Sequence, residues 1–206
     1  ITRRAGFTSV TGNGLGTVSA DFNGDGLLDL FVANDKTMNQ LWINQGDLRF
    51  EDRALEWGSA TDDHGIAKAG MGIVTGDVDN DADLDVLVVN IEGETDSYFR
   101  NEGDYFIDAT ARVGLGSTSR RYTRFGVVLA DLDNDGVLDL YEANGRVTDT
   151  PEPADPADVY AEPNVLYRGQ EMDSGIRFGV LPQGGLGEDV YQTSRGLALG
   201  DLNGDG

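Results

Sequence analysis

The stretch "ADLDNDGVLDLYEANG", residues 130–145, decides the fold because the chain repeats it. Related copies read "GTVSADFNGDGLLDLFVAN" at 16–34, "GIVTGDVDNDADLDVLVVN" at 72–90 and "GVVLADLDNDGVLDLYEAN" at 126–144, and "GLALGDLNGDG" begins at Gly196. The first aspartates of successive copies are 56, 54 and 70 residues apart, and a glycine stands five residues before each of them. Self-similarity at this period indicates stacked or radially arranged supersecondary units.

Strand signals surround each copy. Short β-rich segments such as "GIVTG" precede the aspartates, and apolar runs such as "LDLFVAN" follow them. A weaker second unit follows at 39–52, 96–110 and 164–179, and each consists of an apolar pair, a turn and an aromatic residue. About four strands per unit, without a convincing helical period, predict an all-β fold: a β-propeller with one four-stranded antiparallel blade per unit. A β-solenoid or an open sandwich is the alternative.

Glycine-rich turns extend the comparison between units. Turns such as "VGLG" and "GGLG" follow an aromatic residue near the end of each unit. We expect these aromatic residues to be equivalent in the structure, and they are Phe7, Phe50, Phe106 and Phe178.

The whole chain, residues 1–206, is expected to form an incomplete propeller ring. About three units are present, whereas propellers close with four to eight blades. Further blades beyond Gly206, or self-assembly with partner chains, are therefore expected to cover the strand edges. Residues 146–163 carry four prolines and lengthen one repeat, so we predict an exposed inserted loop there. The acidic loops lie at 21–29, 77–85, 131–139 and 201–206.

Composition limits the class of protein and its partners. The net charge of −22 disfavours nucleic acid and anionic membrane surfaces and favours cations. Hydrophobic residues make up 39% of the chain, which is enough to bury a core. Cysteine is absent from the sequence, which excludes disulfides and thiolate metal sites. The sequence contains no apolar run of about 18 residues, so we expect no membrane insertion.

The aspartates occupy alternate positions of a tight loop, where side chains can converge on one point. Oxygens from positions 1, 3, 5 and 9, with a backbone carbonyl near position 7, would form a cage for a hard cation. Ca²⁺ tolerates irregular oxygen cages, whereas Mg²⁺ demands a stricter octahedron. Without a cation, carboxylates this close repel one another. The predicted Ca²⁺ ligands are Asp21, Asn23, Asp25 and Asp29; Asp77, Asp79, Asp81 and Asp85; Asp131, Asp133, Asp135 and Asp139; and Asp201, Asn203 and Asp205.

Two alternatives to a shared calcium loop need weighing. Solvated acidic turns also favour Asp and Asn, but four copies at one spacing argue against that interpretation. Residues 131–142 also match the EF-hand pattern, with Glu142 at position 12. However, the flanking residues are strand-like, and the sister loops carry Val32 and Val88 at position 12. Glu142 is therefore predicted to be a strand residue. Ala82 replaces the turn glycine of the second loop, where we expect strain.

The sequence also resembles a known family. The pattern "DxDxDGxxDL" after a "Gxxx[AG]" strand is similar to the FG-GAP/VCBS repeat, which also occurs in integrin α-subunit propellers. The strings "GDVDNDADLDVLVVN", "FIDATARVGLG" and "RGLALGDLNGDG" most closely resemble the cartilage-acidic-protein-like (ASPIC/UnbV) group. Over nearly the whole chain, the resemblance implies a calcium-binding β-propeller on a secreted or cell-surface protein, with the residues named above as ligands. A periplasmic location is also compatible. The sequence departs from the family pattern at Ala82 and in the proline-rich insertion at 146–163.

The sequence offers little catalytic machinery. His64, in "TDDHG", is the one histidine, and neither a G-x-S-x-G motif nor a P-loop is present in the sequence. We therefore expect a binding, adhesion or structural module with a protein or carbohydrate ligand, and no enzyme. The alternatives are a lyase-like enzyme acting on polysaccharides and a subunit of an extracellular assembly.

Candidate contact residues are aromatic or basic. Trp42, Trp57 and Tyr98 are expected to be exposed aromatics. The segment "SRRYTR", residues 119–124, is a rare basic cluster in an acidic chain, and local pairing of its arginines with acids is the alternative.

Overall fold

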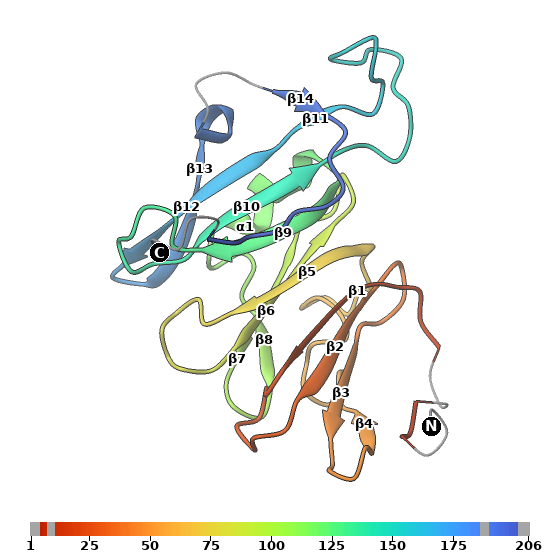
Figure 1. Cartoon of the computed structure of the whole chain (residues 1–206), viewed down its shortest axis with the longest axis vertical. Helices are drawn as coiled ribbons and strands as arrows, with labels where there is room; N and C mark the ends of the chain where they lie inside the picture. The colour runs from red at the N-terminus through yellow and green to blue at the C-terminus, as the bar shows by residue number, and fades with distance from the viewer. Residues whose placement is uncertain (1–4, 8–10, 186–189, 202–206) are drawn as a thin grey trace.

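The chain is all-β, as predicted (Figure 1). The computed structural model describes residues 5–7, 11–185 and 190–201. The first sheet contains β1 (Gly14–Ala20), β2 (Asp29–Asn34), β3 (Gln40–Asn44) and β4 (Phe50–Asp52). The second contains β5 (Gly70–Gly76), β6 (Asp85–Asn90), β7 (Ser97–Asn101) and β8 (Phe106–Asp108). The third contains β9 (Arg124–Ala130), β10 (Asp139–Asn144), β12 (Val165–Met172) and β13 (Gly175–Leu181).

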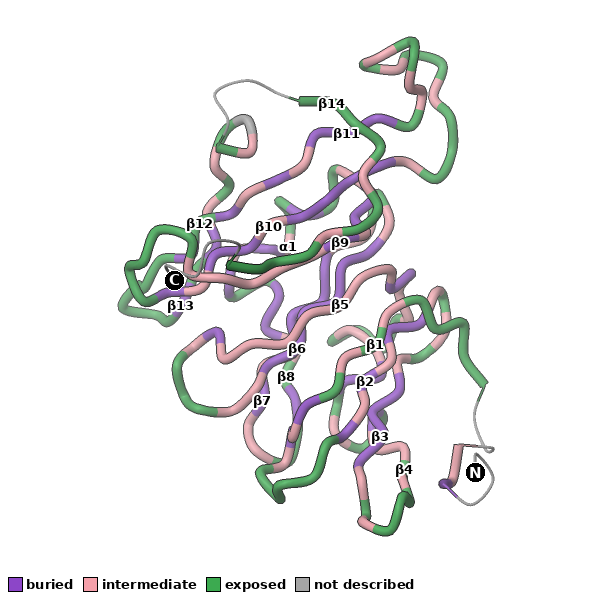
Figure 2. The backbone as a smooth tube through the Cα atoms, viewed as in Figure 1, coloured by how far each residue is buried: buried purple, intermediate pink, exposed green. Residues whose placement is uncertain are grey.

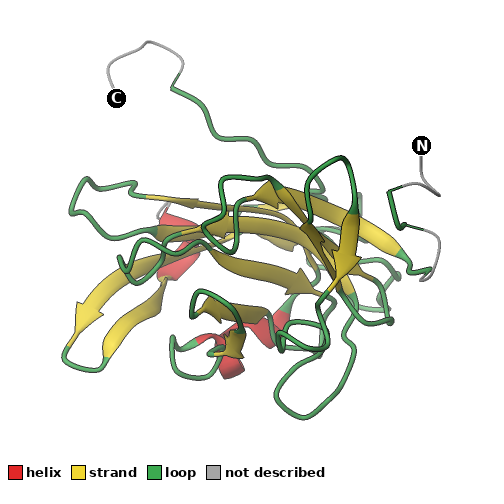
Figure 3. Cartoon of the chain, turned by 90° about the horizontal axis from the view of Figure 1, so that it is seen from below, coloured by secondary structure: helices red, strands yellow, loops and turns green. Residues whose placement is uncertain are grey.

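Each of these sheets is a four-stranded antiparallel meander with its strands in chain order. The strands β11 (Glu162–Pro163) and β14 (Tyr191–Gln192) form a separate two-stranded sheet. Helical structure is confined to short turns in the described chain: α1 (Leu115–Thr118), η1 (Ser119–Arg121) and η2 (Pro182–Gly185) (Figure 3). The architecture is that of propeller-like blades in an incomplete ring, which confirms the predicted fold class. Among the described residues, no helix has the length and apolar character needed to cross a membrane.

The glycine before each acidic loop allows the first strands of neighbouring sheets to approach closely. A Cβ atom at Gly72 would lie 1.8 Å from the carbonyl oxygen of Phe125 in the neighbouring strand β9. At Gly16, a Cβ would lie 2.8 Å from Ile73 Cγ2. The repeated glycine is therefore a packing requirement between β1, β5 and β9.

Two apolar cores lie between the sheets, and they appear as the buried stretches of the inner strands (Figure 2). Alternation along the strands divides the second sheet between its two neighbours. In β6, Val86 and Val88 belong to the core shared with the first sheet, whereas Leu87 and Val89 belong to the core shared with the third. The strand β6 is thus buried on both faces, which explains its nearly continuous apolar sequence.

Hydrogen bonds to the glycine turns show which aromatic residues are equivalent between the sheets, and they correct one prediction. The amides of Phe50, Phe106 and Phe178 donate to the carbonyls of Ala5, Trp57 and Val113 at 2.9, 2.6 and 2.8 Å. Each of these carbonyl residues precedes a glycine with positive φ, so the three phenylalanines are equivalent. The prediction that Phe7 is a fourth equivalent is wrong. Phe7 follows the turn glycine, and its ring stacks on Phe50 with 4.9 Å between centroids.

The exposed aromatic contacts predicted from the sequence are also wrong for two residues. Trp42 is buried, because the ring of Phe7 packs edge-on against it with 4.9 Å between centroids. Tyr98 is buried in the core between the second and third sheets. Trp57 is half-buried beside Phe106. Composition alone does not tell which face of a strand a neighbouring sheet covers.

The arginines of residues 119–124 form no common basic surface. Arg124 is buried, and its Nε donates to Asp96 Oδ1 at 2.7 Å. Arg120 Nε donates to the carbonyl of Gly93 at 3.0 Å, and the Arg121 guanidinium lies over the ring of Tyr122. Local pairing, the alternative interpretation of this cluster, therefore describes Arg124.

The proline-rich segment leaves the third sheet between β10 and β12. It makes the long excursion near β11 (Figure 1), and its last residues form β11. An isolated bridge joins Asp155 to Asp158 within it. Asp158 Oδ2 also accepts the amide of Thr193 at 3.1 Å, so the excursion contacts the segment that follows β14.

Candidate metal loops

The three complete acidic loops share one backbone geometry. In the third loop, the amides of Asp135 and Gly136 donate to Asp131 Oδ1 and Oδ2 at 3.0 and 2.9 Å. The amide of Val137 donates to Asp135 Oδ1 at 3.0 Å. The same three bonds recur in the other loops, with Asp21, Asp25, Gly26 and Leu27 in the first and Asp77, Asp81, Ala82 and Asp83 in the second. The loops join β1 to β2, β5 to β6 and β9 to β10, so strands flank all three, and Glu142 lies in β10 as predicted.

Positions 4 and 6 of each loop have a left-handed backbone. At position 6, φ is 82° for Gly26, 77° for Ala82 and 88° for Gly136. Glycine adopts this conformation without steric cost, whereas a Cβ atom makes it unfavourable. The strain expected at Ala82 is therefore present in the second loop.

Replacing Ala82 by glycine should stabilise the protein by about 0.5–1 kcal/mol, because relief of the left-handed strain exceeds the extra backbone entropy of glycine. Urea unfolding monitored by tryptophan fluorescence measures this change. Gly136→Ala is the matched control at the same loop position. No heavy atom lies within 4 Å of the Cβ it would add, so it should destabilise the protein through φ alone. An Ala82→Gly variant no more stable than the parent protein would contradict the prediction.

The loop geometry gathers the carboxylates of positions 1, 3 and 5. Ligand oxygens of Asp77, Asp79 and Asp81 lie within 4.8 Å of one another, and those of Asp131, Asp133 and Asp135 do so as well. In the first loop Asn23 occupies position 3, and its Oδ1 accepts the amide of Asp25 at 3.1 Å.

The second loop contains a carboxylate oxygen that could coordinate a cation and that makes no hydrogen bond among the described residues. Asp79 Oδ1 is buried and has no hydrogen-bond partner within the described chain. Burial raises the pKa of Asp79, the neighbouring charge of Asp81 raises it further, and Arg100 opposes the shift. An oxygen-only donor set with crowded carboxylates fits a hard cation such as Ca²⁺.

The position-9 aspartates lie outside these groups of three and connect the loop to the third strand of the sheet. Asp85 Oδ2 accepts the amide of Val78 at 3.0 Å, and Oδ1 accepts the amide of Asn101 at 2.8 Å. The Tyr98 hydroxyl donates to Asp85 Oδ2 at 2.7 Å. Burial raises the pKa of Asp85 to about 6 although these hydrogen bonds oppose the shift.

The same connection recurs in the other two sheets. Asp29 accepts the amides of Phe22 and Asn44 at 3.0 and 2.8 Å. Asp139 accepts the amides of Leu132 and Gly169 at 3.1 and 2.9 Å. In the fourth loop Asp201 is exposed, while the predicted ligands Asn203 and Asp205 lie outside the described residues.

Two arginines that lie next to the acidic loops were not predicted from the sequence. Arg168 contacts the carboxylate of Asp133, and its Nη2 lies 3.2 Å from Asp135 Oδ2. Arg100 Nη1 lies 3.8 Å from Asp79 Oδ2. Both come from the third strand of their own sheet, in "FRN" and "YRG". Each arginine follows an aromatic residue in the third strand of its repeat, and an alignment of the repeats would have shown this shared position.

A second acidic cluster includes the lone histidine. Asp62, Asp63 and His64 bring ligand atoms within 4.8 Å of one another, beside a cavity of about 570 Å³ that Lys68 and Arg120 also line. Asp62 Oδ1 already accepts the amides of His64 and Ile66 at 3.0 and 2.8 Å. The hydrogen bonds of Asp62 therefore stabilise a backbone turn. The His64 ring is exposed.

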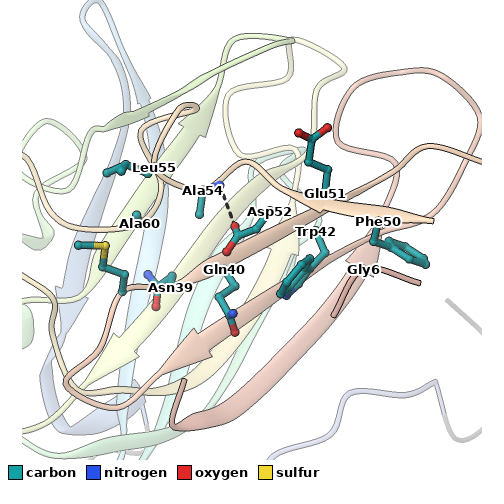
Figure 4. Close-up of a pocket in the computed structure, with 11 residues that line it drawn as sticks. Gly6, Asn39, Gln40, Trp42, Phe50, Glu51, Asp52, Ala54, Leu55 and Ala60 are labelled. Carbon is teal, nitrogen blue, oxygen red and sulfur yellow. Dashed lines mark hydrogen bonds between the residues drawn. The ribbon is translucent and has the colours of Figure 1, made fainter. Parts of the chain in front are cut away.

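The free face of the first sheet holds another cavity, of about 410 Å³ (Figure 4). Its lining residues include Met38, Gln40, Trp42, Phe50 and Leu55. Figure 4 places the side chains of Gln40, Trp42 and Phe50 along β3 and β4. In the same region Asp52 Oδ1 accepts the amide of Ala54 at 3.1 Å. The lining is mostly apolar, and its charged residues are Glu51 and Asp52.

Comparison with known proteins agrees with the repeat geometry. The model of the FG-GAP-like repeat family matches residues 21–88 and 77–142, which together exceed half of the chain. Cartilage acidic protein 1 of Homo sapiens is 26% identical over 187 residues, which cover 83% of this chain and 24% of that protein. The Mus musculus protein of that name is 27% identical over 187 residues, covering 83% and 25%. The Xenopus tropicalis protein is 28% identical over 156 residues, covering 71% and 23%. The chain thus spans about a quarter of the length of these curated relatives.

Proposed function

Because the chain belongs to the FG-GAP-like repeat family, we propose that it is a calcium-binding propeller segment of an extracellular repeat protein. The observation that carries the proposal is the convergence of the position 1, 3 and 5 carboxylates in the second and third loops. The identical pattern of amide bonds extends the proposal to the first loop, where Asn23 supplies an amide oxygen. Three loops of one geometry are better explained by a shared ligand than by chance.

The residues proposed to hold Ca²⁺ are those at positions 1, 3 and 5 of each complete loop, with the position-9 aspartate beside them. Bound Ca²⁺ would supply positive charge where carboxylates repel one another. The position-9 aspartate bonds to the third strand, so the same ion would stabilise the join between loop and sheet. The proposed role of the ion is thus structural.

We propose a binding, adhesion or structural role and not catalysis. Support comes from the relatives, which are named as acidic proteins of cartilage, and from the turn-like bonding of the His64 cluster. Cartilage is a tissue rich in extracellular matrix, which supports the proposed extracellular location. Binding to a glycan array and turnover of acidic polysaccharides would separate this role from that of a lyase-like enzyme.

Removal of calcium should lower the melting temperature. An ion that binds only the folded state stabilises it by roughly 2.7 kcal/mol per site at a hundredfold excess over Kd. Differential scanning calorimetry with excess Ca²⁺ or with a chelator measures the shift, and isothermal titration calorimetry counts the bound ions. The expected result is a higher melting temperature with Ca²⁺ and about three ions bound.

A matched variant separates specific binding from general charge screening. Asp131→Asn removes one carboxylate of the third loop but leaves an oxygen that can still accept the amide of Asp135. It should reduce the calcium-dependent part of the melting shift. Asp173→Asn, which removes an acid from the turn between β12 and β13, is the control. Equal melting curves with Ca²⁺ and chelator would contradict the proposed function.

A further inference from the structure

The residue that faces each acidic loop from the third strand occupies a fixed place. The position-9 aspartates accept the amides of Asn44, Asn101 and Gly169 at 2.8, 2.8 and 2.9 Å. The residue directly before each of these amides is therefore held in register beside its loop. These residues are Ile43 in β3, Arg100 in β7 and Arg168 in β12.

This strand residue is an arginine where loop position 3 is an aspartate, and it is uncharged where position 3 is an asparagine. The first loop has Asn23 at position 3 and Ile43 on the strand. The third loop has Asp133 at position 3, and Arg168 contacts its carboxylate. Counting positions 1, 3, 5 and 9 with the strand residue, both loops carry a formal charge of −3. The arginine thus offsets the extra carboxylate.

Arg168 is well placed to act on a bound ion. Its Nη2 contacts Asp133 Oδ2 and lies 3.2 Å from Asp135 Oδ2, so a single nitrogen reaches two candidate ligands. The side chain is 44% exposed, so it can adjust its position when the loop takes up an ion. It carries one positive charge, whereas Ca²⁺ carries two and binds several oxygens at once.

We propose that Arg168 is a resident counter-cation of the third loop, which stabilises the ion-free loop and lowers its affinity for a divalent cation. This inference rests on the proposed calcium function. The arginine neutralises repulsion before the ion arrives, and it repels the ion once bound. Its presence would bring the third loop, with four carboxylates, towards the affinity of the first, with three.

Arg100 is the weaker counterpart in the second loop. Its Nη1 lies 3.8 Å from Asp79 Oδ2, and its Nη2 contacts the carboxylate of Glu102. Because Glu102 offsets the charge of Arg100, its influence on a bound ion should be smaller than that of Arg168.

The test is a calcium titration followed separately at each loop. The amides of Gly26, Ala82 and Gly136 each donate to the first aspartate of their own loop, so their NMR resonances report on the three sites. For Arg168→Gln we expect about tenfold tighter binding at the third loop, from loss of one repelling charge near a divalent ion. The first loop should be unchanged. For Arg100→Gln we expect less than about threefold tightening at the second loop, in keeping with its longer contact.

A paired substitution tests the charge argument directly. Asp133→Asn combined with Arg168→Gln gives the third loop the ligand set of the first, with asparagine at position 3 and no arginine. The calcium affinity of this double variant should return to within about threefold of the parent protein, since the charge of the site is restored. Arg121→Gln is the control, because the exposed Arg121 lies just before β9 whereas the third loop follows β9, so the length of that strand separates the two.

A second readout needs no calcium. In chelator, Arg168→Gln should melt at a lower temperature than Arg121→Gln, because the ion-free third loop loses its counter-cation. Weaker or unchanged calcium binding in Arg168→Gln, with normal binding in the parent protein, would overturn the inference alone. Absence of calcium binding at all three loops of the parent protein would instead overturn the proposed function.

Discussion

Replacing Arg124 by methionine should lower the free energy of unfolding by about 3–5 kcal/mol, because it leaves a buried carboxylate without its partner. Arg124 is 1% exposed, and Asp96 is fully buried. Besides its bond to Asp96, the guanidinium donates through Nη2 to the carbonyl of Glu94 at 2.9 Å and through Nη1 to that of Tyr122. Methionine fills similar space but offers no positive charge or donor. Chemical unfolding in chelator measures the loss without a contribution from the calcium loops.

Glu142 makes this site sensitive to pH. It is fully buried in β10 against Asp96 and Tyr167, and burial, followed by the charge of Asp96, raises its pKa well above the ordinary value of 4.5. A carboxyl whose pKa is raised on folding contributes stability that is complete below its unfolded pKa. That stability is lost as the pH rises from about 4.5 through the folded pKa.

Glu142→Gln is therefore the informative control for Arg124→Met. It keeps the shape of the side chain but removes the titrating proton, so its stability relative to the parent protein should increase as the pH rises above 4.5. The two variants should thus have opposite effects at neutral pH. An Arg124→Met variant that loses less than about 1 kcal/mol would show that the buried charges are not coupled as described.

The sequence predicted the acidic loops because their geometry is local. Alternate positions of one tight turn set the carboxylates of Asp131, Asp133 and Asp135 together, and no other part of the chain is needed. Arg168 lies 33 residues further along the chain than Asp135, and its position depends on the register of β12 against β10. Sequence spacing alone does not contain that register.

Burial between the sheets was harder to predict for a related reason. Tyr98 and Leu87 lie on the strand faces that pack against the third sheet, while Phe99 and Val86 face the first. Local sequence shows that such strands are apolar on both faces but does not identify which sheet covers which face. The same limit applies to Glu142, which occupies the strand place of Val88 and was predicted to be only a strand residue, without its buried contact with Asp96.

Replacing Gly72 by alanine should destabilise the protein by about 3 kcal/mol, at the upper end for overpacking of a closely packed interior. The added Cβ would lie 1.8 Å from the carbonyl oxygen of Phe125 and 3.0 Å from its carbonyl carbon. Both atoms belong to the backbone of β9, so no side-chain rotation can relieve the overlap. The strands β5 and β9 would have to separate, which would disturb the core between the second and third sheets.

The fourth copy of the motif supplies the matched control for Gly72→Ala. Gly196 stands at the same place, five residues before Asp201, but no heavy atom lies within 4 Å of the Cβ that alanine would add. Gly196→Ala should therefore change the free energy of unfolding by less than about 0.5 kcal/mol, as surface substitutions usually do. Urea unfolding of both variants in the same buffer measures the difference. Equal stabilities would mean that the repeated glycine serves backbone conformation, whereas a large loss confined to Gly72→Ala would establish the close approach of neighbouring first strands as its reason.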